Sequence, residues 1–390
     1  MINWLADKFR IRNSTAQTSG GSEAIIERLR QGQQSHGGIA VDDAVAMKFA
    51  TVYSCVRLIS DTISQMPCHL YRDENGVKTK IDNEPLGRAI SVRPTPGLTS
   101  FDFWKFFTSQ LLLKGYAVAQ KIESGREYRL MPIPKITRVE RGTTGEYFFH
   151  YINSQGATAT LAGSKAFWAF YAMDNDLLPV SPITLQKDAI GLGIQAQRHG
   201  SKTLGTSATP AGILKSPNRL DAQVKQSIKE SWDSTYGPNG SGGIAVLEGG
   251  ADFAKVAMSN EDAQLLQTRQ FQRQEICGIF GVPPHMISDT AQAKGWSTME
   301  QMMTEFVTLT INPLTIRIEQ AISMCLIPPA EWGNRYAKFS TTGLMRGDTT
   351  ARSAYYASGI DKGWLLPAEA RAFEELNPME GGAVNEPGQA

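Results

Sequence analysis

The residues Gly-Val-Pro-Pro at 281 to 284 constrain the fold of this chain more than any other short segment. A residue that precedes proline avoids the helical region of backbone space, and proline supplies no backbone N–H to continue a helix. The segment from Asp262 to Phe280 is therefore predicted to be a helix that stops at Gly281. A separate element must follow Pro284.

A second helix is predicted to begin at Ser297. The sequence Ser-Thr-Met-Glu there is a capping box, in which the Ser297 hydroxyl serves the amide three residues on and Glu300 reaches back. Apolar residues at helical spacing continue past Asn312 and Pro313. This pattern indicates one long helix over residues 298–327 that is kinked at the proline.

The N-terminal segment differs in composition from the rest of the chain. Residues 1–42 are rich in Ser, Gly, Gln and Thr, which predicts a flexible arm. Apolar residues at three- and four-residue steps then predict a single helix from Asp43 to Gln65, which Pro67 terminates.

Beyond this helix the apolar period changes to two, which is typical of strands. Asn75-Gly76 predicts a hairpin turn between CHLYRD and VKTKI. A helix over FDFWKFFTSQLLLKG is predicted to end at Gly115, and residues 45–170 are therefore predicted to form an α+β domain. The further predicted strands are YAVAQKI, YRLMPI, ITRVER and EYFFHYI.

A further helix is predicted from Ser181 to Leu204. It is followed by a segment interrupted by Gly, Pro and Ser. An amphipathic helix is predicted at 220–236 and a strand at 244–248, the residues IAVLE. The C-terminal tail, residues 379–390, is predicted to be disordered.

The composition is that of an ordinary globular protein, with 41% hydrophobic and 20% charged residues. The 39 basic and 38 acidic residues give a formal net charge of +1, which argues against tight binding to DNA phosphates. No apolar run reaches the length needed to cross a bilayer, and the first residues lack the pattern of a secretory signal. We expect no membrane association.

The residues also lack a pattern that indicates catalysis. The five histidines and four cysteines never occur at the spacing of metal ligands, so no metal and no catalytic residue is predicted. Residues 191–196 imitate the start of a dinucleotide fingerprint, but they fall inside a predicted helix. The glycine run at 237–243 lacks the Gly-Lys-Ser/Thr of a phosphate loop. No cofactor is expected.

The helix before Gly-Val-Pro-Pro is unusually polar. Residues 267–275 read QTRQFQRQE and contain one apolar residue, Phe271. Such a helix gains little from burial in a core. It is either exposed to solvent or lines a hydrated passage between identical neighbours, held by hydrogen bonds and ion pairs between subunits.

Three further blocks accompany these helices, at residues 52–71, 220–250 and 344–378. Several features occur in a specific order along the chain. They are the three blocks, the helix that ends at Gly-Val-Pro-Pro, the Glu-Gln of the next helix and Asn-Pro. In that order they resemble the portal proteins of tailed double-stranded DNA phages, in particular the lambda-like type with long non-contractile tails. The resemblance covers residues 45–380.

The resemblance implies an α+β portal-type subunit with an α/β wing domain, a helical stem, a small clip and a C-terminal helical crown. The implied division is an N-terminal arm (1–42), the wing (43–180), stem helices with an intervening clip region (181–285), a tunnel loop (286–297), the long kinked helix (298–327), the crown region (328–378) and a tail (379–390).

The resemblance also implies a role in the virion, as a closed ring at one capsid vertex that is expected to have twelve subunits. Double-stranded DNA would pass through this ring during packaging and ejection. The implied partners are the large terminase subunit, the head-tail adaptor, and the major capsid and scaffold proteins. Assembly would take place in the host cytoplasm.

Particular residues receive roles from the same resemblance. The stem residues expected to line the channel are Gln267, Arg269, Gln270, Arg273 and Gln274. The tunnel loop is placed at Ser288 to Trp296, with Gln292, Lys294 and Trp296 facing the DNA, and the helix kink at Asn312 and Pro313. Two alternatives remain open, a nucleotide- or dinucleotide-dependent enzyme and another virion assembly protein, such as a connector or capsid subunit.

Overall fold

The computed structural model describes most of the chain between residues 39 and 377. The described ranges are 39–125, 127–205, 212–215, 252–255, 260–287, 302–341 and 349–374, with single positions at 221, 223–224, 226–227, 230 and 376–377. The chain divides into two compact units, one containing Gln186–Gly278 with the residues up to Thr51, the other containing Val52–Leu185 with the residues from Ile279 on.

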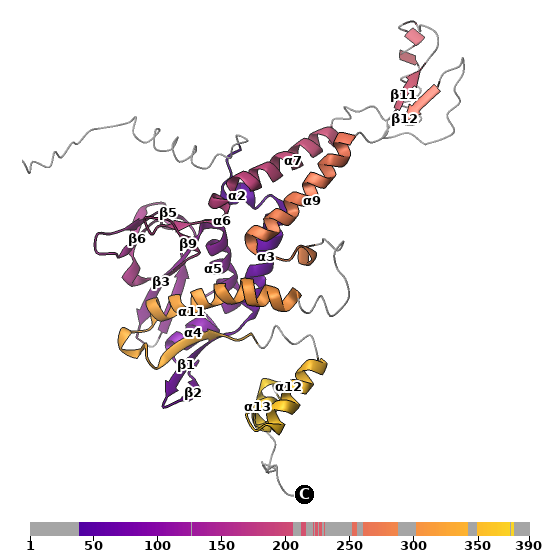
Figure 1. The fold of residues 1–390 in the computed structure, drawn as a ribbon. Coiled ribbons are helices and arrows are strands. Elements are labelled where there is room, and N and C mark those ends of the chain that lie inside the picture. The colour runs from indigo at the N-terminus through magenta and orange to yellow at the C-terminus, as the bar shows by residue number, and fades with distance from the viewer. Residues whose placement is uncertain are drawn as a thin grey trace, which may run out of the picture. The chain divides into compact units, whose positions relative to one another are not determined.

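The second unit begins with a helix and a hairpin (Figure 1). Helix α3 spans Ala50–Gln65 and is followed by β1 (Cys68–Glu74) and β2 (Val77–Lys80). Asn75 and Gly76 both have positive φ, 54° and 84°, as a two-residue hairpin turn requires. The hairpin predicted from the sequence is confirmed. Strand β13 (Arg335–Phe339) joins the other edge of β1, so the sheet order is β13-β1-β2.

Residues 43–65 form two helices, where the sequence predicted one. Helix α2 covers only Asp43–Ala46, capped by Asp42, whose side chain accepts from the Val45 N–H at 2.6 Å. The N–H groups of Lys48 and Phe49 then bond three residues back, to Val45 and Ala46, which tightens the turn and ends the helix. The break places Phe49 against Gly193, a contact that the apolar spacing could not predict.

The central sheet of the second unit has the order β4-β3-β8, all antiparallel. Helix α5 (Ser100–Lys114) leads into it and ends at Gly115, which has φ of 78°, confirming the predicted helix end. Trp104 and Phe107 of α5 pack on Phe167 of β8, and the Phe107 and Phe167 rings stack at 4.7 Å. The sheet strands are β3 (Tyr116–Ser124), β4 (Glu127–Pro132) and β8 (Ala166–Phe170).

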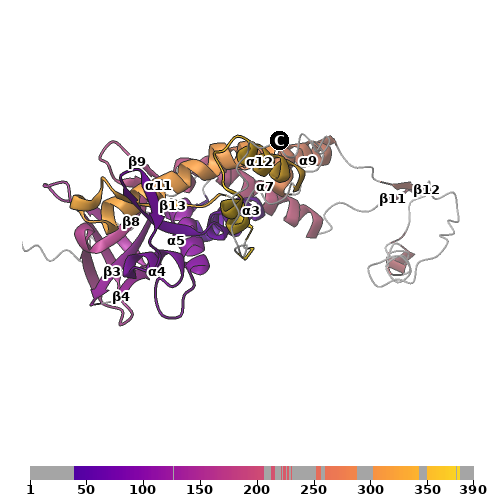
Figure 2. The same cartoon turned by 90° about the horizontal axis from the view of Figure 1, so that it is seen from below.

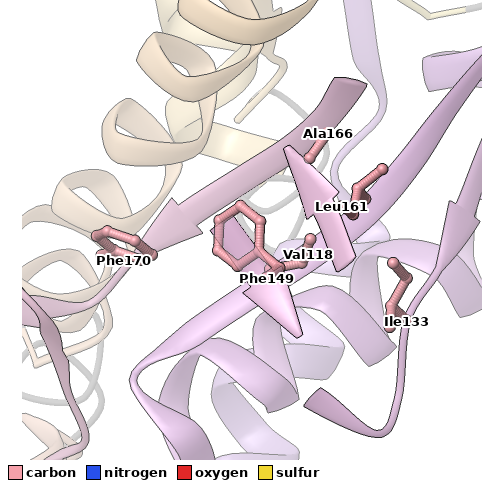
Figure 3. Close-up of a cluster of buried hydrophobic side chains, with 6 residues drawn as sticks. All are labelled: Val118, Ile133, Phe149, Leu161, Ala166 and Phe170. Atoms are coloured by element: carbon pink, nitrogen blue, oxygen red, sulfur yellow. The ribbon is translucent and has the colours of Figure 1, made fainter. Parts of the chain in front are cut away.

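A second three-stranded sheet, β5-β6-β7, packs against the first through a cluster of buried apolar side chains. Figure 3 shows Phe149 of β6 and Leu161 of β7 close to Val118 of β3. The cluster residues are 0% to 7% exposed. Smaller elements complete this part: β5 (Ile136–Arg141), β6 (Tyr147–Ile152), β7 (Thr158–Ala162), a 3-10 turn (Gly163–Lys165), β9 (Ala172–Met173), β10 (Pro179–Val180), α4 (Pro85–Ser91) and α6 (Pro182–Leu185).

Helix α11 (Asn312–Leu326) lies over β8 and β13 of the second unit. Arg317 Nη1 donates to the Phe170 carbonyl at 2.9 Å, and Lys121 Nζ donates to the Cys325 carbonyl at 2.9 Å. Its buried face contains Leu314, Ile318 and Ile322, at helical spacing. A 3-10 turn (Pro329–Glu331) leads to β13, and two further helices, α12 (Thr349–Asp361) and α13 (Pro367–Phe373), belong to the C-terminal region.

The first unit contains two long antiparallel helices, α7 (Lys187–Gly205) and α9 (Asn260–Phe280), that run side by side (Figures 1 and 2). The helix predicted up to Gly281 is thus present as α9. The helix predicted from Ser181 to Leu204 is divided at Gln186 into α6 and α7. A strand pair, β11 (Gly212–Lys215) with β12 (Asp252–Lys255), belongs to the same unit. The strand predicted at 244–248, the arm up to residue 38 and the tail at 379–390 lie outside the described residues, as does most of the helix predicted at 220–236.

Candidate functional site

The polar helix α9 exposes most of the side chains that were predicted to line a channel. Gln267, Arg269, Gln270, Arg273 and Gln274 are all exposed. Gln272, which lies among them, is only 2% exposed. The helix is therefore not uniformly solvated, because one glutamine side chain enters the interior of the first unit.

Helical spacing divides the five predicted residues between two faces of α9. Gln267, Gln270 and Gln274 follow one another at steps of three and four residues and share one face. Arg269 and Arg273 lie four residues apart, on the side of the helix that also carries the buried Gln272 and Ile276. Four of the five, all except Gln274, nevertheless line one cavity.

The buried side of α9 packs against α7 at a glycine. A Cβ added at Gly193 would lie 3.1 Å from Cζ of Phe49 and 3.7 Å from Cδ1 of Ile276. A larger residue at 193 would push the helices apart, so the glycine serves close packing. Gly191 and Gly193 both lie within α7 and do not follow a strand, which removes the strand-to-helix turn that a dinucleotide site needs.

A cavity of about 460 Å³ opens beside this contact, entirely within the first unit. Phe49, Ala50 and Gly193 supply its apolar part, and α9 supplies most of the polar part. The amide nitrogen of Gln272 is buried and has no hydrogen-bond partner among the described residues. The complete lining is Phe49, Ala50, Thr51, Gly193, Gln197, Gln267, Arg269, Gln270, Gln272 and Arg273.

Sequence reasoning missed Gln272, Phe49, Gly193 and Gln197 as site residues. A signal for Gln272 was present, because Gln272, Ile276 and Phe280 recur at steps of four and all three are buried. The polarity of the nine-residue run concealed this pattern. The other three residues come from distant parts of the chain, so no local pattern could have joined them to α9.

Phe271 and Glu275 of α9 do not line the cavity. Phe271 is the one apolar residue of the polar run, yet its side chain is 66% exposed. Glu275, four residues on, is also exposed and lies on the same face. Within the described part of the chain, Arg269, Arg273 and Glu275 form no ion pair.

Gly281 follows the end of α9 and accepts a hydrogen bond from the helical segment that precedes α11, within the second unit. Gly281 has φ of 66°, and the Thr310 hydroxyl donates to its carbonyl at 2.6 Å. Thr310 belongs to a π-helical segment, Val307–Ile311, which leads directly into α11. Since Pro313 has no N–H, the carbonyl four residues earlier lacks its usual donor, and a π-helical turn relieves this loss. The kink assigned to Asn312 and Pro313 stays a prediction.

The tunnel-loop residues Gln292, Lys294 and Trp296 lie outside the described residues, as does the predicted helix start at Ser297. Within the described ranges, no group of three or more His, Cys, Asp or Glu side chains is placed to hold a metal ion. The same ranges contain no helix long and apolar enough to cross a membrane.

None of the four cysteines forms a disulfide. Burial raises the pKa of Cys68 well above its usual value and that of Cys325 to about 11. A thiol of raised pKa carries little thiolate at neutral pH and is a poor nucleophile. Cys55, Cys68 and Cys277 are buried, whereas Cys325 is half-buried.

Comparison with known proteins places these features in a family. The sequence profile described as phage portal protein matches residues 50–375. The probable portal protein of Streptomyces phage phiC31 is 28% identical over 364 residues, which are 90% of this chain and 79% of that protein. The portal protein of Enterobacteria phage HK97 is 25% identical over 354 residues, which are 89% of this chain and 83% of that protein.

The fold also matches a solved structure. A chain in the neck of an empty gene transfer agent (GTA) particle, computed with C6 symmetry, superposes with a TM-score of 0.60 at 20% identity. The match covers 87% of this chain and 94% of the other. This likeness concerns the fold.

Proposed function

This chain belongs to the phage portal protein family, and from that premise we propose that it assembles into a closed ring at one vertex of a capsid. Double-stranded DNA enters and leaves the head through the axial channel of this ring. The proposed ring has twelve subunits. The virion is its final location, and assembly takes place in the host cytoplasm.

The observation that carries the ring proposal is the exposure of α9. Across Gln267 to Glu275, eight of nine residues are polar and only Gln272 is buried. A helix with so little apolar surface gains little stability from its own unit. In a ring, the exposed glutamines of this helix can bond to the same helix of neighbouring subunits and to channel water. The six-fold symmetry computed for the neck that contains the similar chain is consistent with such an arrangement.

Ring formation can be tested directly on the purified protein. We expect negative-stain images of rings with an axial hole, and a mass by sedimentation of about twelve times 42.7 kDa. Protein that stays monomeric over a wide range of concentration and salt, including after attempted assembly with capsid protein, contradicts the proposal.

We further propose that contact with the DNA is transient. The formal net charge of +1 leaves little general attraction for phosphates. In the loop from Ser288 to Trp296, Lys294 is the one basic residue, and Gln292 and Trp296 can touch the backbone without holding it. Weak contacts suit a duplex that must keep moving.

The proposed partners act at the ring and supply the chemistry that it lacks. The large terminase subunit drives the genome through the channel, the head-tail adaptor binds after packaging, and the capsid and scaffold proteins surround the ring. The portal subunit itself is proposed to bind no nucleotide and no nicotinamide cofactor. Turnover of ATP by pure rings, at a rate unaffected by further purification, would contradict this part of the proposal.

A further inference from the structure

We propose that Phe271 and Glu275 of each subunit bind to the next subunit in the ring. Their binding site is the cavity described above, which is lined by residues of α7 and α9 and is called here the α7–α9 cavity. The inference rests on the proposed ring and identifies one of its subunit contacts. The occupant of the cavity is a second copy of this chain.

A ring closed by rotation requires two different surfaces on each subunit. Such a contact is heterologous, because one patch on a subunit meets a different patch on its neighbour. Helix α9 contributes to two such different patches. One is the cavity with Arg269 and Arg273, and the other is the exposed pair Phe271 and Glu275.

The cavity offers hydrogen-bond donors and positive charge but no acidic group. The Gln272 amide nitrogen is buried without a partner, and an unpaired buried donor is unfavourable. Arg269 and Arg273 line the same cavity and can only donate. The matching ligand therefore carries an acceptor with negative charge, which is what the Glu275 carboxylate presents.

The apolar part of the cavity favours a ligand that also carries an apolar group. Phe49, Ala50 and Gly193 line it, so an aromatic ring next to the carboxylate would be desolvated there. Phe271 and Glu275 satisfy both needs, because residues four apart on a helix project side by side, about 5–6 Å apart at Cβ. A free inorganic anion would engage the arginines and leave the apolar part unfilled.

The first test is a disulfide cross-link between subunits. Gln197 lines the cavity on α7 and is exposed, so the double variant Gln197→Cys, Glu275→Cys retains Phe271 and places one thiol on each patch. Oxidation of assembled rings is expected to give a ladder of covalent multimers. The matched control, Gln197→Cys with Gln274→Cys, places the second thiol at a residue that neither lines the cavity nor belongs to the Phe271 and Glu275 pair, and is expected to give at least about tenfold less cross-linked product. Each single-cysteine variant measures the background from the native thiols.

The second test uses charge reversal and rescue. Arg273→Glu alone and Glu275→Arg alone place like charges across the contact, and each is expected to raise the concentration for half-maximal ring assembly about tenfold. The double variant Arg273→Glu, Glu275→Arg restores opposite charges and is expected to return to within about threefold of wild type. Both residues are exposed in the subunit, so the thermal unfolding of unassembled protein should not change.

The outcomes separate this inference from the ring proposal. If rings form normally but the specific cross-link is absent, the assigned contact is wrong. The same holds if neither charge reversal affects assembly. Both outcomes leave the ring proposal unaffected. Absence of rings in the wild-type protein contradicts the ring proposal itself. Reversals that weaken assembly without rescue by the double variant also overturn the pairing of Glu275 with the cavity. Cross-linking together with rescue supports it.

Discussion

Glu319 is a residue whose ionisation opposes folding. Burial raises the pKa of its carboxyl group, although the Phe339 N–H donates to Oε1 at 2.8 Å and Lys338 lies nearby, which both act in the other direction. A carboxyl with a raised folded-state pKa stabilises the protein most at low pH, where it is protonated in both states. This contribution is lost as pH rises through the folded-state pKa.

The variant Glu319→Gln removes the ionisation and keeps an acceptor for Phe339 N–H. Relative to wild type, its free energy of unfolding is expected to increase as pH rises from 4 to 7. Urea unfolding of both proteins at several pH values measures this difference. Glu74, which is 71% exposed at its side chain, provides a control, because Glu74→Gln should show a smaller pH-dependent difference. An equal difference for both variants would contradict the role of burial.

Gly115 occupies a position where both the backbone conformation and the available space favour glycine. Its φ is 78°, and an added Cβ would lie 2.4 Å from the carbonyl carbon of Val180. Left-handed backbone costs about 1–2 kcal/mol for a residue with a Cβ. Gly115→Ala is therefore expected to lower the free energy of unfolding by more than about 2 kcal/mol, since a backbone clash adds to this cost.

Gly125 is the matched control for this prediction. It has φ of 58°, but nothing lies within 4 Å of an added Cβ. Gly125→Ala should therefore show the backbone cost of about 1–2 kcal/mol alone. Denaturant unfolding of the two variants separates the backbone effect from the clash. Equal losses for both would show that Val180 moves aside freely.

At the scale of elements, the junction between the π-helical segment and α11 depends on Pro313. The Asn312 N–H bonds to the Val307 carbonyl, five residues back, which is the π-helical pattern. Pro313→Ala returns a donor at position 313 and allows the regular four-residue pattern. We expect this variant to convert Val307–Ile311 toward α-helix, to straighten the helix and to disturb the preceding loop.

Two measurements check the Pro313→Ala prediction. Hydrogen exchange should show increased protection near residues 309–314, and packaging in vivo should fall while rings still form. Pro85→Ala is a suitable control, because Pro85 is the first residue of α4, where the missing N–H is not needed. If Pro313→Ala packages DNA normally, the geometry of the helix at Pro313 does not affect the function of the loop.

At the scale of the whole molecule, the loop after Pro284 is proposed to touch the moving genome. Deleting Gln292 to Gly295 removes Lys294, the one basic residue of the loop. Rings are expected to form normally, and filled heads are expected to retain less DNA, because the backbone contact is lost. A packaging assay in vivo, with DNA per head measured, provides the test. Normal head filling and normal titre would mean that this loop has no important contact with the genome.

The elements and their ends were largely determined by the sequence alone. The turn at Asn75-Gly76, the helix end at Gly115 and the stop at Gly281 all depend on dihedral preferences of one or two residues. Such preferences act locally, so they can be recognised without knowing the rest of the fold. The family resemblance rested on the order of similar local features.

The tertiary structure alone decided which side chains of α9 are buried. Composition favours burial of Phe271 over Gln272, yet Phe271 is 66% exposed and Gln272 is 2% exposed. The cause is packing of α9 against α7 and Phe49, residues far away in sequence, which sets the rotation of the helix. Phe49 and Gly193, which meet at this contact, also line the cavity. Local preferences of about 1 kcal/mol per residue do not outweigh such packing, so these features could not be predicted from the sequence.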